Sequence, residues 1–166
     1  MTKAYKIKQF VFIAFALMVT SSAFAKKEQA SQFEHQLIRR VVVFPIKTAP
    51  ENQELADEAW WQMRELLTEG QRFLVASKQF LIRNDVLQAR ESLEPADAIL
   101  LGRLLDSHAL MVSILENRVL KMKVYDGLNG VLLYSQEARL HPSVAIKDQL
   151  VKVARLLVAD FMASFP

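Results

Sequence analysis

The chain carries two kinds of hydrophobic pattern in turn, one typical of strands and one of helices. Residues 41–44 form a short run of β-branched and aromatic side chains that ends at Pro45, which predicts a strand covered on both faces. Residues 52–69 repeat apolar side chains every three to four positions, which predicts an amphipathic helix. The same patterns then predict a strand and two helices, at 72–76, 78–92 and 95–106.

After residue 107 the apolar period changes to two, which indicates strands that are half covered. Three stretches, an almost wholly apolar one at 109–115 and two alternating ones at 118–125 and 131–140, are separated by turn residues and predict an antiparallel meander. A last amphipathic helix is predicted at 143–164. The fold class is therefore α/β (α+β), a single compact domain of order β-α-β-α-α-β-β-β-α with a mixed sheet.

The first 25 residues have the three-part layout of a secretory signal peptide: a basic start, an apolar run of about ten residues, and small residues before the cleavage point. Ala23 and Ala25 form the expected signal peptidase site. An uncleaved membrane anchor is the alternative. We expect a polar leader at 26–37, one α/β domain at 38–166, and a periplasmic protein without stable membrane insertion after cleavage.

Cleavage also changes the charge balance. The whole chain has 21 Lys and Arg against 18 Asp and Glu, but three of the lysines lie in the signal segment, so 21 − 3 = 18 basic groups remain against 18 acidic ones. A neutral mature chain does not favour nucleic-acid binding, which needs a basic surplus on one face. With no cysteine in 166 residues, the chain has neither disulfides nor a lipid-anchored cysteine.

No residue cluster in the sequence predicts catalysis, a cofactor or a metal. The histidines His35, His108 and His141 have no ligand spacing, and no serine lies in a G-x-S-x-G turn. The carboxylates Glu54, Asp57 and Glu58 share the polar side of one helix, where charge is usually structural. We therefore expect a protein that is not an enzyme.

Trp61 is the strongest candidate for a binding residue. It falls on the polar side of the helix at 52–69, together with Asp57 and Arg64, whereas Trp60 falls within the apolar stripe. An exposed tryptophan is typical of protein interfaces. The alternative is that the loop at Ala49–Pro50, or Phe33 of the leader, covers Trp61.

A secondary candidate surface follows from the alternation at 118–125. Lys121, Lys123 and Tyr125 fall on a single face of the predicted strand and could form a small basic and aromatic platform. A solvated sheet face explains the same residues and is the favoured interpretation.

Four stretches resemble an α/β domain shared by the curli-secretion protein CsgG, the amino-terminal domain of TolB, the penicillin-binding-protein activator LpoB and the flagellar protein FlgO. They are RRVVVFPI, RELLTEGQRFLVAS, ADAILLGRLLDSHALMVSIL and VYDGLNGVLLYS. The resemblance implies an anticodon-binding-domain-like fold that binds other proteins at the envelope of Gram-negative bacteria without catalysis. CsgG and LpoB carry a lipidated cysteine, which this chain lacks.

The sequence thus predicts an exported module that binds or assembles envelope proteins of unknown identity. One alternative is a small-ligand-binding protein or hydrolase with a site at the strand ends near Pro45, Ile46 and Lys47. Another is a subunit that associates with itself, as a homo-oligomer.

Overall fold

The computed structural model describes residues 38–165, which belong to one compact unit. The predicted signal peptide at 1–25, with Ala23 and Ala25, and the predicted leader at 26–37 lie outside the described residues.

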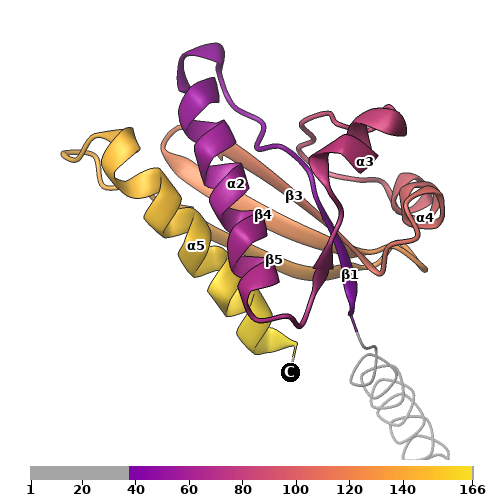
Figure 1. Cartoon of the computed structure of the whole chain (residues 1–166). Helices are drawn as coiled ribbons and strands as arrows, with labels where there is room; N and C mark the ends of the chain where they lie inside the picture. Colours follow the sequence, from indigo (N-terminus) through magenta and orange to yellow (C-terminus); the bar gives the residue numbers. More distant parts are fainter. Residues whose placement is uncertain (1–37, 166) are drawn as a thin grey trace, which may run out of the picture. The chain divides into compact units, whose positions relative to one another are not determined.

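The described residues form a five-stranded sheet and helices in the predicted order (Figure 1). The strands are β1 (Arg40–Val43), β2 (Leu74–Val75), β3 (Ala109–Glu116), β4 (Val119–Asp126) and β5 (Leu132–Arg139). The helices are a 3-10 turn η1 (Pro50–Asn52), α2 (Gln53–Glu69), α3 (Lys78–Arg83), α4 (Pro95–Leu104) and α5 (Ile146–Ser164).

The sheet is mixed, with strand order β2-β1-β3-β4-β5. β1 runs parallel to both of its neighbours, β2 and β3, while β3, β4 and β5 form an antiparallel meander. The predicted fold class, with its mixed sheet and three-stranded meander, is confirmed.

Helices cover both faces of the sheet. The long helices α2 and α5 bury their apolar sides against one face, where Met111, Met122 and Phe161 are fully buried. The shorter α3 and α4 cover part of the other face, around Phe44 and Leu110. The alternation along β1 and β3 supplies both layers, because successive side chains of a strand point to opposite faces.

The helix predicted at 78–92 is wrong in length. α3 ends at Arg83, where Asn84 Nδ2 donates a hydrogen bond to the carbonyl oxygen of Phe80 and Asp85 adopts a left-handed backbone with φ 53°. The chain then continues without regular structure, yet it buries Val86 and Leu93 in the α3–α4 layer. The helix prediction rests on the apolar side chains Phe80, Leu81, Val86 and Leu87, and their spacing does not show where the helix ends.

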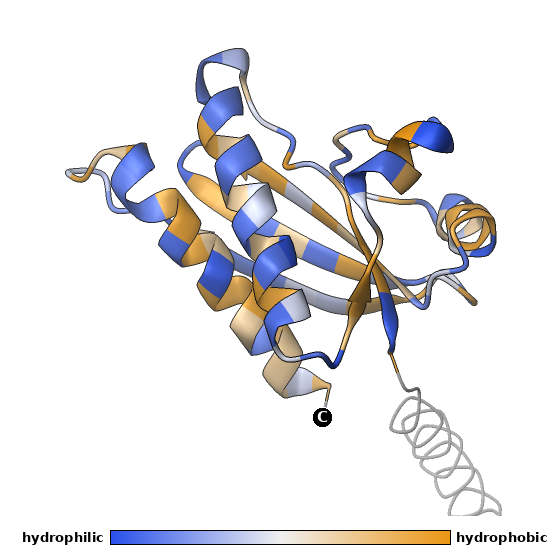
Figure 2. Ribbon diagram, in the orientation of Figure 1, coloured by the Kyte–Doolittle hydropathy of each residue, from blue (hydrophilic) through white to orange (hydrophobic). Residues whose placement is uncertain are grey.

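α4 buries one side in the core and leaves part of its apolar surface exposed to solvent. Figure 2 shows α4 hydrophobic around most of its circumference, and two of its leucines, Leu100 and Leu104, are exposed. Gly102 packs closely against the β4–β5 turn, because a Cβ there would lie 2.0 Å from the carbonyl oxygen of Gly127. Only glycine allows this approach of two backbones.

Candidate protein-binding surface

The two adjacent tryptophans of α2 point in different directions, as the helical pattern predicts. Trp60 is 5% exposed, and its Nε1 donates a hydrogen bond of 2.9 Å to the carbonyl oxygen of Val43 in β1. Trp61 is 55% exposed. Within the described residues, neither Ala49 nor Pro50 removes Trp61 from solvent, so a large aromatic surface stays open on α2.

Trp61 borders a groove of about 440 Å³ between α2 and the segment that follows α3. Both tryptophans line it, with charged side chains at its rim and apolar ones on the opposite wall. The lining residues are Pro45, Gln53, Asp57, Trp60, Trp61, Lys78, Leu87 and Ala89. The groove thus combines an aromatic wall with a few polar groups, which is the usual composition of a binding site.

Arg64 corrects one prediction from the sequence. It was expected on the solvated side of α2, but only 9% of it is exposed. The reason is tertiary: this side of α2 faces the end of β2, where Arg64 Nη2 donates a hydrogen bond of 2.8 Å to the carbonyl oxygen of Ala76. Burial lowers the pKa of the guanidinium.

The Arg64 guanidinium also supports both tryptophans. Its central carbon lies 4.7 Å from the ring centre of Trp60 and 5.5 Å from that of Trp61. These are cation–π distances, and they fix the orientation of the exposed ring from beneath. Arg64 therefore positions Trp61 instead of offering its own charge to solvent.

The two charged groups at the groove, Asp57 and Lys78, differ in their hydrogen bonds and ion pairs. Asp57 Oδ1 accepts a hydrogen bond of 2.8 Å from Gln53 Nε2, one helical turn earlier. The ammonium group of Lys78 lies 5.9 Å from the ring centre of Trp60, and none of the ion pairs within residues 38–165 includes Lys78. The groove therefore offers an available positive group beside its aromatic wall.

The secondary candidate surface does not have the predicted form. Lys121 and Lys123 are half-buried on the sheet face that α3 and α4 leave partly open, but Tyr125 is only 7% exposed because it packs in the α3–α4 layer. The pKa of Glu91 is lowered chiefly by its hydrogen bond with Lys47, and Lys123 and Lys121 lie close enough to lower it further. The predicted platform therefore lacks its exposed aromatic ring.

Pro45, Ile46 and Lys47, the alternative site predicted from the sequence, lie in three different environments. Pro45 lines the Trp61 groove, Ile46 is fully buried, and Lys47 borders a separate concavity of about 450 Å³. Glu91 and Arg118 also line this concavity, and Lys47 Nζ donates a hydrogen bond of 2.9 Å to Glu91 Oε2. It lies beyond the carboxyl ends of β1 and β3, the edge where open α/β sheets commonly bind ligands.

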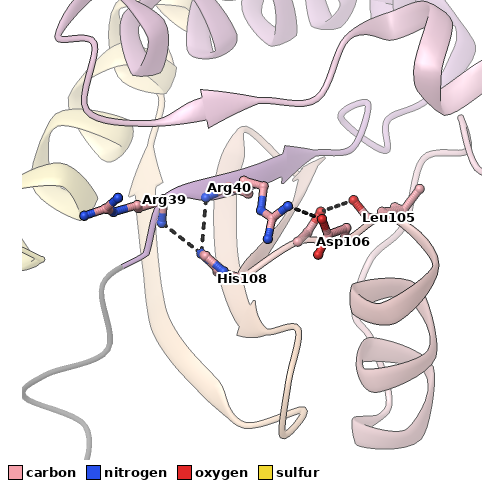
Figure 3. A network of polar contacts seen from close by, with 6 residues as sticks. Arg39, Arg40, Leu105, Asp106 and His108 are labelled. Atoms are coloured by element: carbon pink, nitrogen blue, oxygen red, sulfur yellow. Dashed lines mark hydrogen bonds and ion pairs between the residues drawn. The ribbon is translucent and has the colours of Figure 1, made fainter.

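A polar network closes the opposite end of β1 (Figure 3). His108 Nδ1 accepts hydrogen bonds from the backbone N–H groups of Arg39, at 3.1 Å, and Arg40, at 3.4 Å. The guanidinium of Arg40 pairs with the carboxylate of Asp106. This histidine, found in the sequence as an isolated residue, joins the start of β1 to the start of β3.

Two further searches cover the described part of the chain only. Between residues 38 and 165, no three His, Cys, Asp or Glu side chains converge as a metal site. In the same range, no helix has the length and apolar composition needed to cross a bilayer.

No protein-family model and no curated protein matches the chain. Solved structures do. The LpoB C-terminal domain from Escherichia coli is similar with a TM-score of 0.50 and 20% identity, over 62% of this chain and 82% of that one. The LpoB C-terminal domain from Salmonella enterica gives 0.50 and 17%, over 69% and 91%. TolB from Acinetobacter baumannii gives 0.51 and 9%, over 76% of this chain and 28% of TolB.

At these identities the likeness is one of fold. It supports the part of the predicted resemblance that names LpoB, since two LpoB domains are covered over most of their length. The finer resemblances to CsgG, to the amino-terminal domain of TolB and to FlgO stay predictions from the sequence. The chain has a fold similar to that of the LpoB C-terminal domain.

Proposed function

We propose that this protein is an exported, non-enzymatic module of the cell envelope, and that it binds a partner protein through the groove beside Trp61. The single observation that carries the proposal is the 55% exposure of Trp61 next to a groove of about 440 Å³. Tryptophan is enriched among the residues that contribute most to protein interfaces. The signal peptide predicted at 1–25 supports the periplasmic location.

The groove favours an extended segment with an apolar anchor and a nearby acidic group. The indole ring of Trp61 offers an apolar surface, and the guanidinium of Arg64 holds it in place from below. Lys78 supplies positive charge at the rim, while Asp57, which accepts a hydrogen bond from the neutral amide of Gln53, keeps its negative charge on the α2 side. An acidic group on the partner would therefore meet Lys78.

The test is cross-linking in the native host, with the whole chain and its first 25 residues intact. A photo-reactive residue at Gln53, in the groove, should capture a specific envelope protein. Trp61→Ala should weaken that capture by about 30-fold, the loss of a hot spot worth about 2 kcal/mol. Leu100→Ala, at a residue that is 66% exposed on α4, should leave it unchanged. Equal capture by both variants would overturn the proposal.

A second candidate function is small-ligand binding at the concavity beside Lys47. Its specific support is the volume of about 450 Å³ at the carboxyl ends of β1 and β3, with Lys47, Glu91 and Arg118 in its wall. Titration with small carboxylic acids should then shift the NMR signals of the Thr48 and Asn117 amides. A ligand that shifts these signals without affecting partner capture would favour this second function.

A further inference from the structure

β5 is an edge strand whose outer side has no partner within the described residues. It pairs with β4 alone. The backbone N–H of Leu140 donates to the carbonyl oxygen of Arg118 at 2.7 Å, and from this pair every second residue of β5 bonds to β4. The residues between them, Ser135, Glu137 and Arg139, therefore direct their N–H and C=O groups outward. Such an edge is a template for another strand.

The helix over this edge is also open on its outer side. Arg155 Nη1 donates to Gln62 Oε1 at 3.0 Å, which places α2 on one side of α5. At 100° per residue, the side of α5 away from α2 includes four residues from the middle of the helix. They are Gln149, Val153, Leu156 and Asp160. Leu156 is 64% exposed, whereas Val153 is half-buried at the edge of the core.

A hydrogen bond between β5 and α5 indicates which residues of the helix lie beside which residues of the strand. The hydroxyl group of Tyr134 donates a hydrogen bond of 3.4 Å to the carbonyl oxygen of Leu157. Gln136 points to the same face of the sheet as Tyr134, because the two residues are two positions apart on the strand. The middle of β5 and the pair Val153 and Leu156 therefore lie at about the same height.

From this geometry we propose that β5 pairs antiparallel with β5 of a second copy of this chain, about a two-fold axis through Gln136. The two sheets then continue into one, and the two α5 helices lie side by side on the same face. This surface is separate from the Trp61 groove, which lies on the α3 side of α2 and stays open in the dimer.

Helix spacing supports a second copy as the occupant. α5 contacts both β4 and β5, so it lies about half a strand spacing inside the edge. With strands about 4.8 Å apart, the two α5 helices of the dimer are about 10 Å apart, which is the packing distance of helices. Val153 of one copy then meets Leu156 of the other, and Gln149 meets Asp160.

The register is also compatible with self-pairing. About an axis through Gln136, Ser135 lies opposite Glu137 of the second copy, and Leu133 lies opposite Arg139. No two like charges are directly opposed, whereas an axis through Glu137 would place two carboxylates together, which is unfavourable. In this register the two Glu137 side chains are diagonal neighbours across the axis, and each lies opposite a serine.

A single cysteine provides the first test, because the chain contains none. On the axis, the Cα atoms of the two Gln136 residues form a non-hydrogen-bonded pair about 4.5 Å apart, within the range of a disulfide. The full chain with Gln136→Cys should therefore oxidise to a covalent homodimer. Leu100→Cys, at a position that is also exposed but lies on α4, should remain monomeric. Failure of Gln136→Cys to cross-link, or equal cross-linking of both variants, would overturn the proposal.

Sedimentation equilibrium of the full chain provides the second test. Leu156→Lys should raise the dimer dissociation constant at least about tenfold, while Leu100→Lys should leave it within about twofold. Ser135→Glu should weaken the dimer and Ser135→Lys strengthen it, because residue 135 faces Glu137. A wild-type chain that is monomeric up to about 1 mM, or an edge occupied by a different protein, would refute self-pairing. Trp61→Ala should not change the dimer dissociation constant. The experiment can therefore contradict self-pairing without contradicting the proposed function, and the reverse.

Discussion

At the scale of single residues, a helical pattern predicts on which side of the helix a side chain lies, but not which other element packs against that side. It correctly separated Trp60, which is buried, from Trp61, which is exposed one residue later. It placed Arg64 in solvent because the pattern contains no information about β2, whose following residue Ala76 accepts the Arg64 hydrogen bond. The exposed candidate was therefore predictable from the sequence, and the buried residue that positions it was not.

The pair of Lys47 and Glu91 gives a prediction for the pH dependence of one group. The hydrogen bond and the charge of Lys47 lower the pKa of Glu91. This pair therefore contributes to stability above the ordinary glutamate pKa of about 4.3, and the contribution is lost as pH falls through the lower value in the folded state. Lys47→Gln should raise the pKa of Glu91, as followed by NMR of its carboxyl carbon.

Lys152→Gln is the control for this titration, since Lys152 is exposed on α5 and does not contribute to the pKa of Glu91. An unchanged Glu91 pKa in Lys47→Gln would contradict the prediction. Both partners of the pair are about half exposed, so its loss should alter overall stability little.

At the scale of elements, local patterns located most strands and the long helices well. The three strands of the meander agree with the structure to within one or two residues, because β4 and β5 alternate in sequence and β3, which is buried on both faces, is almost wholly apolar. The structure of the segment after Arg83 was predicted wrongly, because that segment is held by contacts with residues distant in the sequence. Its contacts, such as Arg90 over Phe44 and Glu91 with Lys47, join residues more than forty positions apart.

The contact between α4 and the β4–β5 turn predicts a large effect from one methyl group. In Gly102→Ala, the new Cβ would lie 2.0 Å from the carbonyl oxygen of Gly127, so the helix and the turn must separate. We expect a loss of about 2–4 kcal/mol in the free energy of unfolding, measured with urea.

Gly70→Ala is the matched control for Gly102→Ala. Its Cβ would meet only the Met162 methyl group, at an ordinary 3.8 Å, and the backbone at Gly70 has a φ of −77° that alanine adopts freely. The change should stay within about 0.5 kcal/mol. Similar effects of the two substitutions would show that the close backbone approach is not what constrains α4.

At the scale of the whole molecule, the sheet separates two layers of unequal size. α2 and α5, of 17 and 19 residues, share the larger core, whereas α3 and α4 have 6 and 10 residues and leave Leu100 and Leu104 exposed. Fewer buried apolar contacts mean a lower free energy of local opening. The α3–α4 layer should therefore open while β3, β4 and the other layer stay folded.

Native-state hydrogen exchange, with one buried leucine shortened in each layer, tests this order of opening. Leu81→Ala, in α3, should lower the opening free energy of α3–α4 amides and of the sheet alike, by about 2–4 kcal/mol. Leu150→Ala, in α5, should lower it for the sheet and leave α3–α4 unchanged, because that layer opens without disturbing α5. If Leu150→Ala accelerated exchange equally in both layers, the two layers would unfold as one unit, and the smaller one could not move independently beside the Trp61 groove.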